Sequence, residues 1–198
     1  TSLSEVTLAG SMKTISDNVF SGCSNLKTLT IPEGVTSLGY YMISGTGISS
    51  ITIPSTVTSS RSNGTNGALA GCVTLTSVTF APGTKKIPDY ICASRDQTSY
   101  IQTVTIPDSV EEIGYAAFYN CVSLTGGIDI PKATKFIRNY AFYGCKSITS
   151  VTMHQNDTVE WVGSERVAWA GTIENNVFEG CTSLSEVTLA GSMKTISD

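Results

Sequence analysis

The feature that most constrains this fold is a unit of about 23 residues that recurs along the whole chain. Its clearest copy, IQTVTIPDSVEEIGYAAFYNCVSL, runs from Ile101 to Leu124. Within it, Val104-Thr105-Ile106 alternates with the period of two expected of a strand. Pro107 should end that strand because proline cannot donate to a sheet ladder. The apolar positions then become irregular, and residues 115–118 suit one short helical turn. Each unit therefore predicts a strand, a corner, a short straight piece, a short helical turn and a second corner.

The unit can be followed through the chain by the apolar residue that opens each copy. These residues are Leu3, Leu26, Ile48, Leu75, Ile101, Leu124, Ile148 and Leu184. The expected strand cores are Val6–Leu8, Leu29–Ile31, Ile51–Ile53, Val78–Phe80, Val104–Ile106, Ile128–Ile130, Val151–Met153 and Val187–Leu189. No single unit can bury its apolar face, whereas stacked units share a continuous core. We therefore predict one solenoid domain over residues 1–198, with about seven coils and a single parallel sheet on one face.

The pattern L-x-x-V-T-I-P-x-x-V-x-x-I-G-x-x-A-F-x-x-C resembles the BspA-type leucine-rich repeats of bacterial and some protozoan surface proteins. The resemblance covers essentially the whole chain. It implies a leucine-rich repeat fold, an extracellular or cell-surface location, and adhesion to protein partners on a host or a neighbouring cell. The family offers no catalytic motif that could be carried over to this sequence.

Composition excludes several other classes of function. Only 14% of the residues are charged and the net charge is -4, so the basic face of a nucleic-acid binder is missing. No apolar run is long enough to enter a membrane. With one histidine, no glycine-rich phosphate loop and no nucleophile motif, we predict no enzyme, no catalytic residue, no cofactor and no metal site. Because the sequence starts at Thr1 without a signal peptide, any secretion signal or anchor is expected outside it.

The two ends of the sequence are identical. Residues 1–17 and 182–198 both read TSLSEVTLAGSMKTISD, whereas the internal copies share only their apolar pattern. This identity predicts a second period of 181 residues, either natural or engineered, although the matching ends could also be an accident of the sequence boundaries. Solenoids need polar caps to remain monomeric, and neither end supplies one. Head-to-tail self-association into a filament is therefore the alternative function.

Three insertions interrupt the repeat, at 60–68, 94–100 and 154–172. The last contains both tryptophans and could form a β-hairpin that stands off the solenoid. Tryptophan is enriched at binding hot spots, so a recognition loop is one interpretation, and rings that fold back over the solenoid flank are the other. The candidate partner-binding residues in these insertions are Trp161, Trp169, Arg166, His154, Arg61, Asn63 and Tyr100.

The outward positions of the predicted strands form a file of hydroxyl side chains. Its threonines are Thr30, Thr52, Thr79, Thr105 and Thr152, and Asp129 interrupts them. Such a ladder could bind ice or a glycan. Threonine also has high strand propensity, which explains the file without any ligand.

Five of the six cysteines occupy one position of the unit, near its end. Adjacent coils would bring such residues within disulfide range. The site ends an inward-facing turn, however, so buried free thiols that behave as small apolar side chains are the other interpretation.

Overall fold

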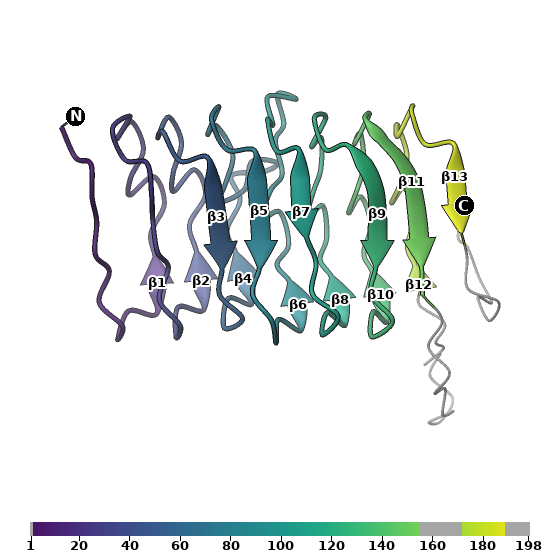
Figure 1. Cartoon of the computed structure of the whole chain (residues 1–198), viewed down its shortest axis with the longest axis horizontal. Coiled ribbons are helices and arrows are strands. Elements are labelled where there is room, and N and C mark those ends of the chain that lie inside the picture. Colours follow the sequence, from purple (N-terminus) through teal and green to yellow (C-terminus); the bar gives the residue numbers. More distant parts are fainter. Residues whose placement is uncertain (1, 155–171, 189–198) are drawn as a thin grey trace.

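The computed structural model describes residues 2–154 and 172–188 as an elongated stack of coils that contains no helix in this part of the chain. Each coil crosses the molecule and returns beside the previous one, so the strands of neighbouring coils run parallel (Figure 1). Hydrogen bonds between adjacent coils join residues from 21 apart, at Thr56 and Val35, to 39 apart, at Cys181 and Phe142. The predicted leucine-rich repeat solenoid is thereby confirmed.

The broad face in Figure 1 carries the longer strands, which form the sheets β3-β5-β7 and β9-β11-β13. Their register pairs Ile51 with Val78, Val78 with Val104, and Val151 with both Ile128 and Val187, as the repeat predicts. The strands are β3 (Ser50–Ile53), β5 (Ser77–Phe80), β7 (Thr103–Thr105), β9 (Gly126–Ile130), β11 (Ile148–Met153) and β13 (Glu186–Thr188).

The main face is therefore divided into two sheets instead of the single sheet that was predicted. The division falls between β7 and β9, where β9 begins at Gly126 with a left-handed φ of 79°. The register of β9 with β11 also shifts between Ile148 and Ser150. The extra residue at this shift is Thr149 of β11, so the pairing of β9 with β11 begins with a bulge that locally disrupts the ladder.

A second row of two-residue strands, which the sequence did not predict, lies behind the first. Most of them follow the proline that ends the main strand of their coil and place one apolar residue inside, as Ile87 and Ile113 do. The row is made of β1 (Thr14–Ile15), β2 (Ser37–Leu38), β4 (Ser59–Ser60), β6 (Lys86–Ile87), β8 (Glu112–Ile113), β10 (Phe136–Ile137) and β12 (Thr172–Ile173).

The short helical turn expected over 115–118 is not formed, and the prediction was wrong. The backbone N–H of Ala116 donates to Asn139 O at 3.0 Å, and that of Phe118 donates to Ala141 O at 2.8 Å. A helix would direct these N–H groups to carbonyls within the same turn. Because alternate residues bond instead to the next coil, the turns form a third hydrogen-bonded row along the solenoid.

The first two coils depart from the predicted strand pattern. Residues 6–8 and 29–31 are not strands, and no hydrogen bond joins residues 28–31 to β3 within the described structure. A groove of about 380 Å³ lies there, between Thr28–Ile31 and β3. Leu29 and Ile31 are nevertheless buried, so the apolar pattern places these residues correctly while the backbone pairing is lost.

One continuous core runs through the stack. The rings of Phe118, Phe142 and Phe178 lie at the same position of successive coils, with centroids 5.0 and 5.6 Å apart and nearly parallel planes. Phe80 meets Phe118 edge-on from the strand side at 6.3 Å. This aromatic file fixes how the turns stack and therefore how the side chains outside the turns align.

Candidate functional site

The turn row displays a group of tyrosines on its outer side. Tyr90 and Tyr140 share one position of the repeat, which Ala116 occupies in the coil between them. All three have a left-handed backbone, with φ of 57°, 61° and 51°. Tyr119 and Tyr143 share a second position, directly after the buried phenylalanine. Since the phenylalanines point inward, the residue that follows each of them points outward.

Five tyrosine rings form an unbroken chain of contacts. Tyr119 and Tyr143 stack with centroids 4.9 Å apart and planes 6° from parallel. Tyr140 meets Tyr143 edge-on at 5.7 Å and also meets Tyr115 edge-on at 5.7 Å. Tyr115 lies 5.3 Å from Tyr90. Edge-to-face and stacked pairs of this kind stabilise one another, so the rings form a preorganised surface.

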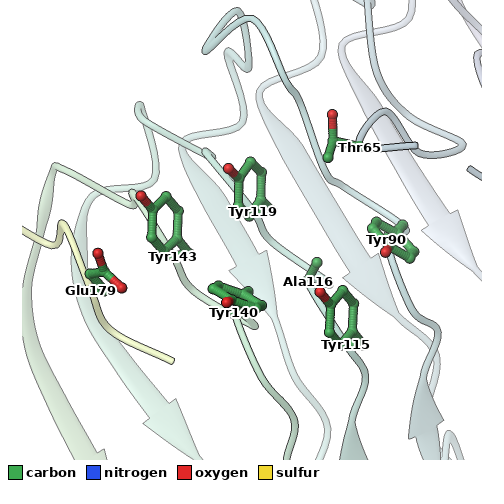
Figure 2. A pocket seen from close by; sticks show the side chains of 8 residues that line it. All are labelled: Thr65, Tyr90, Tyr115, Ala116, Tyr119, Tyr140, Tyr143 and Glu179. Atoms are coloured by element: carbon green, nitrogen blue, oxygen red, sulfur yellow. The ribbon is translucent and has the colours of Figure 1, made fainter. Parts of the chain in front are cut away.

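The rings enclose a groove of about 390 Å³, here called the tyrosine groove. Figure 2 shows Ala116 between the rings, Thr65 above Tyr90 in this view, and Glu179 beside Tyr143. Thr65 comes from the 60–68 insertion and Glu179 from the coil after the 154–172 insertion. The groove therefore crosses several coils, and Thr65, which belongs to one of the three insertions, borders it.

Two phenols of the groove have pKa values raised above that of an ordinary tyrosine, which is itself protonated at neutral pH. Burial raises the pKa of Tyr90 above its ordinary value, and the neighbouring Tyr115 adds to the effect. Burial likewise raises the pKa of Tyr119, with a further contribution from Tyr143. Both phenols can therefore donate as well as accept a hydrogen bond. At the end of the groove, the Glu179 carboxylate accepts a hydrogen bond from Asn176 Nδ2.

A family model described as "BspA type Leucine rich repeat region" matches residues 1–125, 65–165 and 169–198, with six copies of the repeat. The chain belongs to the BspA-type leucine-rich repeat family. No curated protein matches it. Among solved structures, a leucine-rich repeat protein from Bacteroides ovatus is 22% identical over 94% of this chain and 55% of its own, with a TM-score of 0.55. This likeness shows the fold.

Two further solved structures have lower TM-scores. A leucine-rich cell surface protein from Faecalibacterium prausnitzii is 19% identical over 94% of this chain and 61% of its own, with a TM-score of 0.45. A leucine-rich repeat protein from T. pallidum is 23% identical over 77% of this chain and 73% of its own, at 0.49. The chain thus spans less than two thirds of the length of the Faecalibacterium and Bacteroides proteins.

The predicted partner-binding residues of this BspA-type repeat are dispersed in the structure. Arg61 pairs with Asp17 at 2.7 Å and lies 6.0 Å from the Tyr40 ring. Asn63 and Tyr100 are exposed on their insertions. His154 Nε2 lies 2.5 Å from Asp129 Oδ1 on the strand face. The structure does not bring these four residues together, and none of them lines the tyrosine groove.

Trp161, Trp169 and Arg166 lie outside the described residues. Their role as a recognition loop, and the alternative that the tryptophan rings cover the solenoid flank, therefore stay predictions.

The hydroxyl ladder is present in part. Thr52, Thr79 and Thr105 pair along β3-β5-β7, and Thr152 pairs with Asp129 and Thr188 in the other sheet. Thr30 is exposed but lies beside the groove in the strand face rather than in a strand. Asp129 and its contact with His154 separate the two runs of hydroxyls, so no uniform plane spans the described coils.

The cysteines are free thiols, and all but the half-buried Cys181 are buried. In the described part of the chain, no group of three or more His, Cys, Asp or Glu side chains could hold a metal ion. Over the same residues, no helix is long and apolar enough to cross a membrane.

The tyrosine groove was not predicted from the sequence. Tyr90, Tyr115, Tyr119, Tyr140 and Tyr143 lie in the regular parts of the repeat, where the pattern indicates only scaffold. A signal was present, because two tyrosines recur on the outward positions of the 115–119 and 140–143 turns. That the rings converge around a hollow depends on the stacking of the coils and could not be obtained from the spacing alone.

Proposed function

We propose that this chain is a non-enzymatic protein-binding module of a cell-surface protein, and that the tyrosine groove is its binding surface. The observation that carries the proposal is the chain of five partly exposed tyrosines around a hollow of about 390 Å³. Membership of the BspA-type family favours the surface location.

Tyrosine suits this role for physical reasons. Its ring contributes a large apolar contact area with little side-chain entropy to lose, and its hydroxyl remains available for hydrogen bonds. Tyrosine is accordingly enriched at interfaces and among hot spots. Here the rings already pack on one another, so little ordering is required when a partner binds. The residues that line the groove include one carboxylate, Glu179, and no histidine or cysteine, which favours binding over catalysis.

Binding of the fluorescently labelled protein to intact epithelial and bacterial cells tests the proposal. We expect saturable binding that is lost when the cells are first treated with protease. The double variant Tyr119→Ala/Tyr143→Ala should bind at least about tenfold more weakly, as expected for hot-spot residues. Thr52→Ala/Thr105→Ala on the strand face is the matched control. Absence of saturable binding, or binding that survives protease treatment, would refute the proposal.

The insertion tryptophans can be tested in the same assay. If they form a second recognition element, Trp161→Ala/Trp169→Ala should also weaken binding without lowering solubility. Unchanged binding would eliminate the recognition-loop hypothesis and leave the tyrosine groove as the only candidate.

Self-association remains the alternative function, and one observation favours it. Residues 1–17 and 182–198 are identical, so a head-to-tail contact between copies could continue the repeat with a period of 181 residues. Light scattering over a range of concentrations decides the matter: a mass that rises with concentration supports a filament, and a constant monomer mass contradicts it.

A further inference from the structure

We infer that the tyrosine groove binds an extended peptide segment that carries a lysine or arginine, with the basic group directed to Glu179. The inference rests on the proposed protein-binding function and specifies the chemistry of the partner.

The groove is opened by a missing ring. Ala116 occupies the repeat position that carries Tyr90 in the preceding coil and Tyr140 in the following coil. All three residues adopt the same left-handed backbone, so the conformation itself does not exclude tyrosine from position 116. Ala116 is 2% exposed and lies between the rings (Figure 2). The hollow is therefore the space that a third tyrosine of this file would occupy.

The shape of the groove fits an extended chain. Its lining comes from successive coils, from Thr65 and Tyr90 through Tyr115 and Tyr140 to Glu179, so its long direction follows the solenoid. Neighbouring coils stack at roughly the strand spacing of 4.8 Å. An extended peptide of a few residues is therefore long enough to cross several coils along the groove. Tyr119 and Tyr143 stack on each other, which occupies ring faces that a sugar would otherwise use as platforms.

Charge selects the basic side chain. Glu179 is exposed and is held by Asn176, and no basic side chain pairs with it among the described residues. Tyr90 and Tyr119 are neutral phenols at pH 7, as tyrosine ordinarily is, and burial raises the pKa of each further. A lysine or arginine could lay its aliphatic stem along the rings and place its charge at the carboxylate. An acidic segment would meet Glu179 without compensation.

The probe is a displayed library of random 12-residue peptides, selected on the immobilised protein and counter-selected on Ala116→Tyr. We expect enrichment of peptides that contain lysine or arginine. For synthetic copies of these peptides, Ala116→Tyr should raise Kd at least about tenfold by filling the hollow. Glu179→Gln should raise Kd about threefold and reduce its salt dependence, as expected of an exposed charge pair. Glu33→Gln, an exposed carboxylate on another part of the solenoid, is the control.

Ala116→Tyr should fold, because Tyr90 and Tyr140 tolerate the same backbone conformation, and its thermal midpoint verifies this. If it does not fold, Tyr119→Leu replaces it as the groove variant. Three results would overturn the inference: enriched peptides without a basic preference, an unchanged Kd in Glu179→Gln, or binding to a glycan array that the groove variant abolishes. In each case, protease-sensitive cell binding would still uphold the proposed function, whereas its absence would refute that function separately.

Discussion

At the scale of single residues, a left-handed backbone conformation explains why glycine or asparagine precedes the cysteine in most copies of the repeat. The backbone there has a positive φ in six coils, which accounts for glycine or asparagine at this site. These residues are Gly22, Gly45, Gly71, Asn120, Gly144 and Gly180. The repeat therefore selects this residue through its backbone conformation rather than through burial.

Substitutions at two glycines distinguish the cost of backbone strain from the cost of a steric clash. Gly22 has φ +77° and open space where a methyl group would point, whereas at Gly144, with φ +68°, a methyl group would strike Oδ1 of Asn120. Gly22→Ala should lose about 1 kcal/mol of unfolding free energy from strain alone. Gly144→Ala should lose more, about 2–3 kcal/mol, because overpacking is added. Urea denaturation measures both, and equal losses would contradict this account.

The cysteine position has a hydrogen-bonding role. In three coils the thiol lies within bonding distance of the carbonyl at the aromatic position of the preceding coil: Cys121 Sγ to Cys92 O at 3.3 Å, Cys145 Sγ to Phe118 O at 3.1 Å, and Cys181 Sγ to Phe142 O at 3.2 Å. These S–H groups thus donate to backbone carbonyls, which favours free thiols over disulfides at these sites.

The thiols should also be unreactive. Burial raises the pKa of Cys121 to about 12 and that of Cys181 to about 11, and it raises the pKa of Cys145 well above its ordinary value. Since the thiolate is the reactive form, iodoacetamide at about pH 8 should leave Cys121 and Cys145 unmodified in the native protein and alkylate them in urea. Peptide mass spectrometry gives the result. Rapid native alkylation at these two sites would show that the coils open readily.

At the scale of elements, ion pairs connect the short strands of the second row. Glu111 bonds Lys85 and Lys135, each at 2.7 Å. One residue along, Glu112 lies between Lys86 at 3.0 Å and Arg138 at 3.2 Å. Each carboxylate thus joins the coils on both sides of it. Exposed pairs contribute little singly, but here they align strands that are only two residues long.

These pairs predict a pH dependence of stability. Hydrogen bonds from Lys135 and Lys85 lower the pKa of Glu111 below its ordinary 4.5. Burial opposes the shift at Glu112, but bonds from Arg138 and Lys86 outweigh it and lower that pKa as well. A lowered folded pKa contributes stability that is present above about pH 4.5 and is lost as the pH falls through the folded value. Thermal midpoints should drop below about pH 4.5, and less steeply in Glu111→Gln/Glu112→Gln; identical profiles would contradict this.

At the scale of the whole molecule, coil contacts are unevenly distributed. The aromatic file and the ion pairs of the second row lie in coils between residues 80 and 178, whereas residues 28–31 make no hydrogen bonds to β3 in the described structure. In a solenoid, stability is close to a sum of coil and neighbour contributions, so weaker contacts give locally weaker structure.

Hydrogen exchange should reveal this gradient. Amides of Leu29–Ile31 should exchange fast although two of the side chains are buried, because exchange depends on backbone bonding. Amides of β9 and β11, which are paired in register over Val151–Met153, should be protected most strongly. Mass spectrometry of peptides from a native exchange series tests this, and uniform protection along the chain would contradict it.

The sequence alone determined the solenoid, the register of its main strands and the inward residues of each coil. It could do so because apolar side chains at a fixed repeat position must share one core. The same reasoning failed at residues 115–118, where local spacing suggested a helical turn but the N–H groups bond to the next coil. The sequence pattern also did not reveal the second row of strands, because a strand of two residues is too short to show an alternation of apolar and polar residues.

Only the tertiary structure revealed the tyrosine groove, the surface that we propose for binding. Tyr90, Tyr115 and Tyr143 are distant in sequence and sit on ordinary outward positions, and the stacking of coils at a fixed rise brings their rings together. The hollow depends on a single replacement, alanine in place of tyrosine at position 116, whose effect exists only because its neighbours in the adjacent coils are rings. A repeat pattern specifies each coil, whereas a groove across coils is a property of the stack.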